Sequence, residues 1–189
     1  ISGGRPTTTL AKASTFTVSG IVTQNDIDAV ISHAVGSVDL GNRHVLHLLP
    51  VAYVLDGVET TQPPLGMHGK ELAIDVAIVT MEAAPLQNLR MAIERSHLAL
   101  SGMALTPYAS ARAVLATDEL ELGTALIDVG GATTDVAVFR RGKLVASAVV
   151  PIGGQHVTND IAHGLSTTVV HAERLKTLFG TVLANGHDE

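Results

Sequence analysis

The stretch LIDVGGATTDVAVF, residues 126–139, places two apolar segments on either side of a turn built from very small side chains. The apolar segments predict two strands joined as a hairpin. An ordinary hairpin turn needs one or two glycines, whereas this one combines Gly130 and Gly131 with Ala132 and two threonines. Small side chains allow a backbone to approach a ligand closely, and successive N–H groups in such a turn can converge on an anion. The stretch is therefore either a tight hairpin with aspartates as turn residues or a cradle for a phosphate.

The polar residues around the turn are compatible with the phosphate cradle. Thr133 and Thr134 add hydroxyl donors, and Asp128 ends the incoming strand, where a carboxylate could hold a hydrated Mg²⁺ or orient an attacking water. The turn is not a Walker A loop, because it lacks Gly-Lys-Ser/Thr. It is not a dinucleotide fingerprint either, because no G-x-G-x-x-G opens a helix. Taken alone, the turn leaves both possibilities open.

Two downstream features add to the phosphate hypothesis. A second glycine pair, Gly153 and Gly154, precedes a predicted helix, where the backbone could approach a phosphate or a ribose. In the segment HAERLK, Glu173 and Lys176 stand three residues apart and share one face of a predicted helix. A carboxylate and an amine in that position could clasp a ribose and a base edge, or they could form a solvated surface ion pair.

The composition limits the class of protein. The chain has 189 residues, a formal net charge of −6 and no cysteine, which excludes a disulfide framework and a thiolate metal site. The acidic balance argues against a nucleic-acid-binding surface. No apolar run approaches the roughly 20 residues that span a bilayer, and no secretory signal opens the chain. Because the sequence starts at Ile1 and ends abruptly in GTVLANGHDE, we expect a fragment, with functional parts outside it.

Hydrophobic periodicity and turn residues predict an alternation of strands and helices. The segment 44–59 is rich in β-formers, with Pro50 marking an edge strand or a bulge. The strand over 70–81 is expected to have one well-buried face. The other predicted elements are a short strand within 14–22, helices over 23–35, 84–100 and 107–123, strands over 135–139 and 144–150, and a helix ending at Gly180.

Taken together, three motifs resemble the actin-like ATPase superfamily: LIDVGGATTDVAVF, VVPIGGQHVTNDIA and HAERLK. They look like its second phosphate-binding hairpin, the segment after it and the adenosine helix. Within the superfamily the chain is most similar to the FtsA family of bacterial cell-division proteins. The upstream stretches HVLHLLPVAYVLDG and PLGMHGKELAIDVAIVT resemble the subdomain inserted in that family. The hairpin alone is less specific, because sugar kinases and heat-shock chaperones share it.

The resemblance implies an α/β fold made of portions of two actin-like, ribonuclease H-like lobes with an inserted small α+β subdomain. It implies the end of a first-lobe strand at 1–5 and the inserted subdomain at 6–83. Helices of the first lobe would follow at 84–121, and the second lobe with its phosphate hairpin would begin at 122–189. The first phosphate hairpin would precede Ile1, and the rest of the second lobe and a membrane-targeting helix would follow Glu189.

The resemblance also implies a site for ATP and Mg²⁺. Asp128 would act near the metal or the attacking water, holding Mg²⁺ indirectly. The nucleotide would be bound by Gly130, Gly131, Ala132 and Thr133 through backbone N–H groups, by Gly153 and Gly154, and by Glu173 and Lys176 at the nucleoside. The family's third hairpin glycine is replaced here by Ala132, and a positive φ at that position would cost alanine about 1 kcal/mol.

The implied function is that of a cell-division scaffold, with at most slow ATP hydrolysis in the full-length protein and an inactive fragment. Such a protein would link the FtsZ ring to the membrane, recruit later division proteins and associate with itself into filaments. It would work in the cytoplasm, at the inner face of the membrane at the division site, and would bind no nucleic acid. The alternatives are a pilus-assembly protein similar to PilM, against which the stretch from His47 to Gly57 argues, and a small-molecule kinase of the sugar-kinase type.

Overall fold

The computed structural model describes residues 1, 4–60 and 62–183. The chain divides into two compact units. Unit 1 comprises Ile1–Asp128 and Asp135–Val149, and unit 2 comprises Val129–Thr134 and Val150–Glu189. Each unit is described by itself below.

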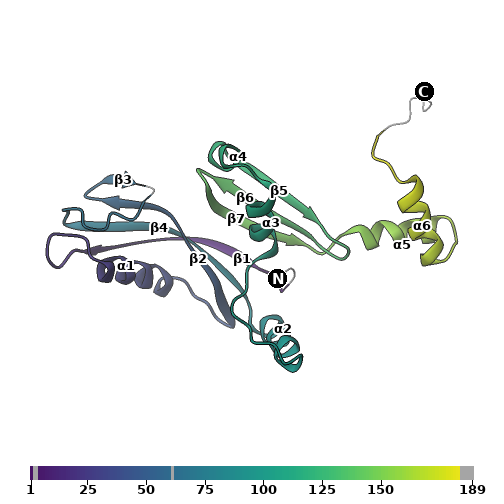
Figure 1. The fold of residues 1–189 in the computed structure, drawn as a ribbon, viewed down its shortest axis with the longest axis horizontal. Helices are drawn as coiled ribbons and strands as arrows, with labels where there is room; N and C mark the ends of the chain where they lie inside the picture. The colour runs from purple at the N-terminus through teal and green to yellow at the C-terminus, as the bar shows by residue number, and fades with distance from the viewer. Residues whose placement is uncertain (2–3, 61, 184–189) are drawn as a thin grey trace. The chain divides into compact units, whose positions relative to one another are not determined.

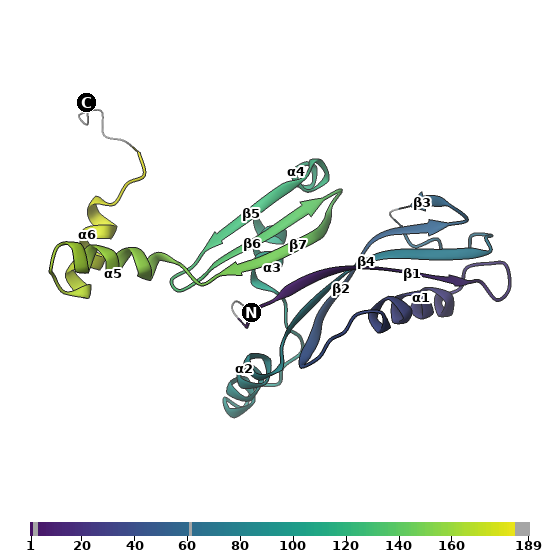
Figure 2. The ribbon, with the colours of Figure 1, turned by 180° about the vertical axis from the view of Figure 1, so that it is seen from behind.

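Seven strands and six helices follow the chain (Figures 1 and 2). The strands are β1 (Thr7–Phe16), β2 (Arg43–Leu55), β3 (Val58–Thr60), β4 (Glu71–Glu82), β5 (Thr124–Val129), β6 (Thr134–Arg140) and β7 (Lys143–Val150). The helices are α1 (Gln24–Gly36), α2 (Ala83–Arg95), α3 (Thr106–Val114), α4 (Thr117–Leu122), α5 (Gly154–Gly164) and α6 (Val169–Phe179). Within the described residues no helix has the length and apolar character needed to cross a membrane.

The larger sheet of unit 1 has the strand order β1-β4-β2-β3, and β4 pairs antiparallel with both β1 and β2. Alternate residues of β4 point to one face, where Leu72, Ile74, Val76 and Ile78 are fully buried. Their partners in this core include Val30 on α1, so the helix covers that face of the sheet. The fold is α/β, as predicted.

The prediction of one buried face on β4 is wrong, because the other face is buried as well from Ala77 onward. Val79 and Met81 belong to a second core that includes Leu105 and Phe139. The helical and hairpin residues that follow in the chain supply this second cover, which periodicity within one strand could not indicate. The central strand therefore joins two cores within unit 1.

The first strand lies earlier than predicted. β1 ends at Phe16, and the residues after it form a loop, not the second half of a strand over 14–22. β1 is an edge strand that carries β-branched threonines on the exposed side, and Leu10 is 57% exposed. Because apolar and polar residues do not segregate cleanly between its two faces, the strand has little hydrophobic periodicity.

The predicted helix over 107–123 is two helices. The backbone is extended at Leu115 and Ala116, between α3 and α4. The amide of Ala116 donates to the Glu119 carboxylate at 2.8 Å, which caps the start of α4. Likewise, α2 ends at Arg95 and does not continue to residue 100.

Other local predictions are confirmed. α1 begins after Thr23, whose side chain accepts from the Asp26 amide at 3.3 Å, while the Asp26 carboxylate accepts from the Thr23 amide at 2.8 Å. The register of β2 shifts between Pro50 and Ala52, which is the bulge that the proline indicated.

Candidate functional site

The glycine turn lies between β5 and β6, two neighbouring strands of a three-stranded sheet. The Gly130 amide donates to the Thr133 carbonyl at 2.8 Å and closes the turn. Positive φ values of described non-glycine residues occur at other positions, so Ala132 carries no left-handed strain. The replacement of the family's glycine by Ala132 therefore has no conformational cost of that kind.

The start of α5 is hydrogen-bonded to the turn. The Gly154 amide donates to the Gly130 carbonyl at 2.9 Å, and the Gln155 amide donates to the Gly131 carbonyl at 2.8 Å. These are amides of the first turn of the helix, which have no acceptor inside the helix. The glycine turn thus caps α5, and turn and helix are held together by backbone atoms alone.

Gly153 makes this contact possible. A Cβ at this position would lie 2.5 Å from the Gly130 carbonyl oxygen and 2.7 Å from that of Gly131, which is closer than real contacts allow. Gly153 is buried and has an ordinary extended φ of −154°. Its glycine is therefore required by lack of space and not by backbone conformation. The sequence suggested close approach to a ligand here, and the structure shows close approach to the turn.

The same hydrogen bonds decide which amides are open. The Gly153 amide donates to Nδ1 of His156 at 3.1 Å, and the amides of Gly130 and Gly154 are bonded as described. Among residues 129–134 and 150–183, the amides of Gly131 and Ala132 have no intramolecular acceptor, and both residues are exposed. If an anion is bound here, these two N–H groups are the ones available to it without rearrangement.

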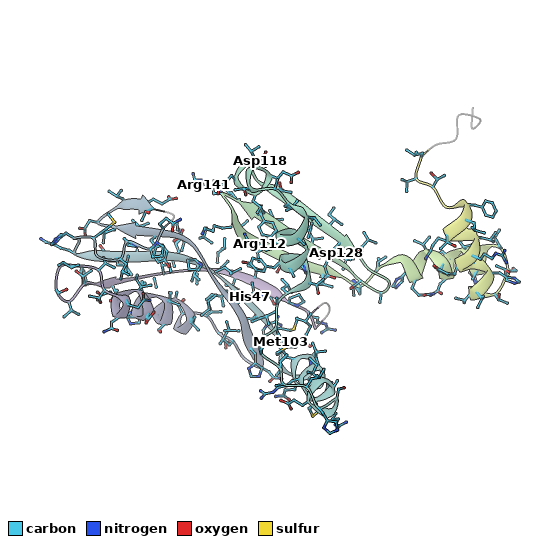
Figure 3. All side chains as sticks on the ribbon, viewed as in Figure 1. His47, Met103, Arg112, Asp118, Asp128 and Arg141 are labelled. Atoms are coloured by element: carbon cyan, nitrogen blue, oxygen red, sulfur yellow. The ribbon has the colours of Figure 1, made fainter. Side chains whose placement is uncertain are left out.

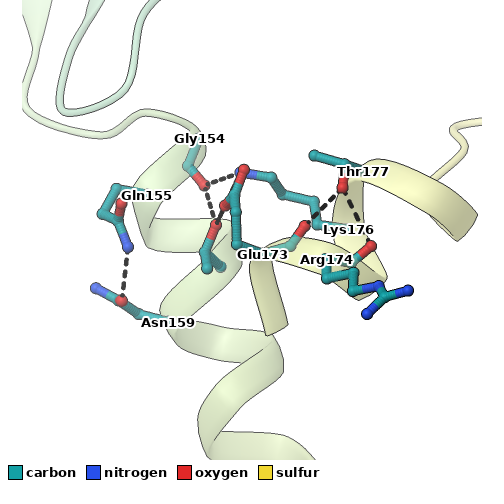
Figure 4. Close-up of polar contacts among 8 residues, drawn as sticks. Gly154, Gln155, Asn159, Glu173, Arg174, Lys176 and Thr177 are labelled. Atoms are coloured by element: carbon teal, nitrogen blue, oxygen red, sulfur yellow. Dashed lines mark hydrogen bonds and ion pairs between the residues drawn. The ribbon is translucent and has the colours of Figure 1, made fainter. Parts of the chain in front are cut away.

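Glu173 and Lys176 form the predicted pair on α6, and their contacts continue onto α5 (Figure 4). The Lys176 ammonium lies 2.8 Å from Oε2 of Glu173 and donates to the Thr158 hydroxyl at 2.7 Å and to the Gly154 carbonyl at 3.1 Å. The Thr158 hydroxyl donates to the same Oε2 at 2.5 Å. The pair is therefore not a simple surface ion pair, because it ties α6 to the start of α5.

This network leaves different capacities on its two charged groups. An ammonium has three N–H donors, and Lys176 uses all of them on Glu173, Thr158 and Gly154. Oε1 of Glu173 accepts no hydrogen bond from the described part of the chain, and the side chain is 47% exposed. The hydrogen bond from Lys176 and, second, that from Thr158 hold the pKa of Glu173 below its ordinary value. The carboxylate is thus charged at neutral pH and keeps one oxygen open.

Asp128 precedes the turn in the chain, near the end of β5 in unit 1 (Figure 3). The Ser110 hydroxyl, on α3, donates to its Oδ2 at 2.8 Å. This bond fixes the carboxylate and leaves Oδ1 with capacity to accept. Throughout the ranges that the structure describes, no three His, Asp or Glu side chains are grouped to hold a metal. One carboxylate suits Mg²⁺ only if phosphates and water supply the other ligands.

The structure joins most of the predicted site residues into one connected set. Hydrogen bonds and close packing link the turn residues Gly130 and Gly131 to the glycine pair at the start of α5, and Lys176 links that pair to Glu173. Two residues were missed, Thr158 and Ser110. Neither has a sequence signal, because only the folded chain brings a hydroxyl to these carboxylates.

Comparisons with known proteins were made for the whole chain. The family model "Cell division protein FtsA" matches residues 125–189, and "SHS2 domain inserted in FTSA" matches residues 4–80. The cell division protein FtsA of Agrobacterium fabrum is 42% identical over 189 residues, which are 100% of this chain and 43% of that protein. The FtsA of Rhizobium meliloti is 45% identical over 168 residues, or 89% of this chain and 38% of that protein.

A solved structure shares the fold. It belongs to a PilM–PilN type IV pilus biogenesis complex and superimposes with a TM-score of 0.60, covering 92% of this chain and 48% of that chain. At 17% identity the likeness concerns the fold alone. The chain spans less than half the length of the curated relatives described above.

Proposed function

Because the chain belongs to the FtsA family, as its sequence suggested, we propose that it is the nucleotide-binding part of a cell-division protein. The observation that carries the proposal is the contact between the glycine turn and the start of α5. That contact leaves two neighbouring amides, of Gly131 and Ala132, without an internal acceptor in the described part of unit 2. Convergent backbone N–H groups beside a glycine-rich close approach suit a phosphate.

We propose ATP with Mg²⁺ as the ligand. The amides of Gly131 and Ala132 would hold phosphate oxygens, with Thr133 beside them. Gly130, Gly153 and Gly154 would shape the cradle, since their own amides are already bonded within it. A bound Mg²⁺ would neutralise phosphate charge in such a site.

Asp128 has a different role in the proposal. Its carboxylate, oriented by the Ser110 hydroxyl at 2.8 Å, would accept hydrogen bonds from water around Mg²⁺ and hold that water in place. Catalysis of this kind consists of positioning and charge stabilisation. We propose slow hydrolysis at most.

At the other end of the ligand, Glu173 would accept a hydrogen bond from a nucleoside hydroxyl through its open Oε1. Lys176 would support it and not bind the nucleoside itself, because its three donors are used. This revises the sequence-based hypothesis that both side chains clasp the nucleoside.

The domain layout and the cellular role are also proposals. Residues 1–5 and 84–121 would belong to a first actin-like lobe, 6–83 to the inserted subdomain and 122–189 to a second lobe. The whole protein would link the FtsZ ring to the cytoplasmic face of the membrane, recruit later division proteins and form filaments. The support is its membership of a family of cell-division proteins.

Calorimetric titration with MgATP tests the proposal, using the protein encoded by the complete reading frame. We expect saturable binding, and we expect Asp128→Asn to reduce phosphate release far more than ATP affinity. The matched control is Asp160→Asn, an exposed carboxylate on α5, which should change neither. Absence of ATP binding contradicts the site, and normal turnover in Asp128→Asn contradicts the role of Asp128.

A further inference from the structure

Thr158 is a buried polar residue in the middle of α5, with 0% of its surface exposed. Burying a hydroxyl without a partner costs on the order of 1–3 kcal/mol, so a buried threonine signifies hydrogen bonds that only the hydroxyl can make. Here the hydroxyl lies 2.5 Å from Oε2 of Glu173 and 2.7 Å from the Lys176 ammonium.

The hydroxyl connects three parts of unit 2. It donates to Glu173 and accepts from Lys176, and its oxygen lies 3.1 Å from the Gly154 carbonyl, one helical turn earlier. A hydroxyl has one proton, and the 2.5 Å distance assigns it to the carboxylate. Oε2 is thus occupied by two donors, and Oε1 is the acceptor that remains.

We propose that Thr158 is a positioning residue for the nucleoside of the bound nucleotide, an inference that rests on the proposed function. Its hydroxyl fixes the Glu173 carboxylate so that Oε1 accepts from a ribose hydroxyl. Lys176 is the second positioning residue, since its donors hold the same carboxylate and the start of α5.

The contact between the turn and α5 does not depend on Thr158. It is made by the backbone bonds from Gly154 to Gly130 and from Gln155 to Gly131. Loss of the hydroxyl should therefore weaken recognition of the nucleoside and leave recognition of the phosphates unchanged. ATP and inorganic tripolyphosphate, each with Mg²⁺, separate the two.

The experiment measures the affinities of MgATP and Mg-tripolyphosphate by calorimetry in the protein encoded by the complete reading frame. The variants are Thr158→Val, which keeps the shape and removes the hydroxyl, and Thr158→Ser, which keeps the hydroxyl. We expect Thr158→Val to weaken MgATP binding roughly tenfold, the effect of one lost hydrogen bond to a charged group. Mg-tripolyphosphate affinity should be unchanged, and Thr158→Ser should restore MgATP affinity.

The outcomes are distinct. Equal MgATP affinity in wild type and Thr158→Val overturns the inference. Parallel loss of both ligands, or a Thr158→Ser variant as weak as Thr158→Val, also overturns it, because a purely structural role would act on both. If Thr158→Val does not fold, Thr158→Ala gives the same comparison with a smaller side chain. A wild-type protein that binds neither ligand overturns the proposed function itself.

Discussion

The sheet of unit 1 and the glycine-rich part of unit 2 are held together by different kinds of contact. In unit 1, side chains such as Leu72, Ile74 and Ile78 fill an aliphatic core and are fully buried. In the described part of unit 2, the buried hydrophobic residues are the small Ala162 and Ala172. There the turn and α5 meet through backbone hydrogen bonds, and α5 and α6 through a polar cluster around Thr158.

The difference shows how one chain builds a framework and a binding surface by different means. Aliphatic packing tolerates change of shape but supplies no donors or acceptors. Contact through glycine backbones leaves no room for a Cβ at Gly153, and it puts the turn's remaining amides at the surface. Substitutions in unit 1 should therefore lower stability, and substitutions in the turn contact should alter ligand binding.

The largest expected effect concerns the framework. Ile78→Ala removes a fully buried side chain from β4 and should lower the free energy of unfolding by about 3 kcal/mol, through lost burial and the cavity left behind. Ile127→Ala, on a side chain that is 65% exposed, is the control and should cost less than about 1 kcal/mol. Denaturant unfolding measures both. Similar losses would show that β4 does not anchor the core.

The next effect concerns the turn contact. Gly153→Ala places a Cβ 2.5 Å from the Gly130 carbonyl oxygen and should force the turn away from α5, at about 1–3 kcal/mol. ATP affinity should fall with it. Gly164→Ala is the control in the same helix, because no atom lies within 4 Å of its Cβ. Unchanged ATP binding and stability in Gly153→Ala would refute the close contact.

A smaller effect is expected at the start of α1. Thr23→Ala removes the side chain that accepts from the Asp26 amide, and should cost about 1 kcal/mol of unfolding free energy. Thr23→Ser keeps an acceptor and should stay close to wild type. Equal loss in both variants would mean that the cap contributes nothing beyond side-chain volume.

The smallest effect is pH dependence at His47 in unit 1 (Figure 3). Burial lowers its pKa from 6.5, and Nε2 accepts from the Leu105 amide at 3.0 Å. The unfolded chain therefore binds more protons at this residue, so its contribution to stability is present above pH 6.5 and declines as the pH falls below that value. His47→Gln should flatten the difference in melting temperature between pH 7 and pH 5.5. An unchanged difference would contradict a buried, neutral His47.

Sequence patterns predicted the elements whose signals are local. α1 follows from its cap and its apolar spacing, and the bulge in β2 follows from Pro50. The patterns failed where packing across the chain decides the structure. β1 has exposed apolar and buried small residues, and the second core over Val79 depends on segments distant in sequence.

For the site, the sequence indicated the right residue types but not their contacts. Gly153 was expected to approach a ligand, whereas its missing side chain makes room for the turn. Lys176 was expected at the nucleoside, whereas its three donors are occupied by protein atoms. Thr158 could not be found, because its partner Glu173 is fifteen residues away and one helix further along the chain.

The central claim is that the amides of Gly131 and Ala132 receive the phosphates of a nucleotide. Two-dimensional ¹H–¹⁵N NMR of the protein encoded by the complete reading frame, titrated with MgATP, tests it most directly. We expect the amide signals of Gly131 and Ala132 to shift most among the turn residues, saturably, and to shift with Mg-tripolyphosphate as well. Saturable shifts elsewhere with these two signals unmoved would contradict it.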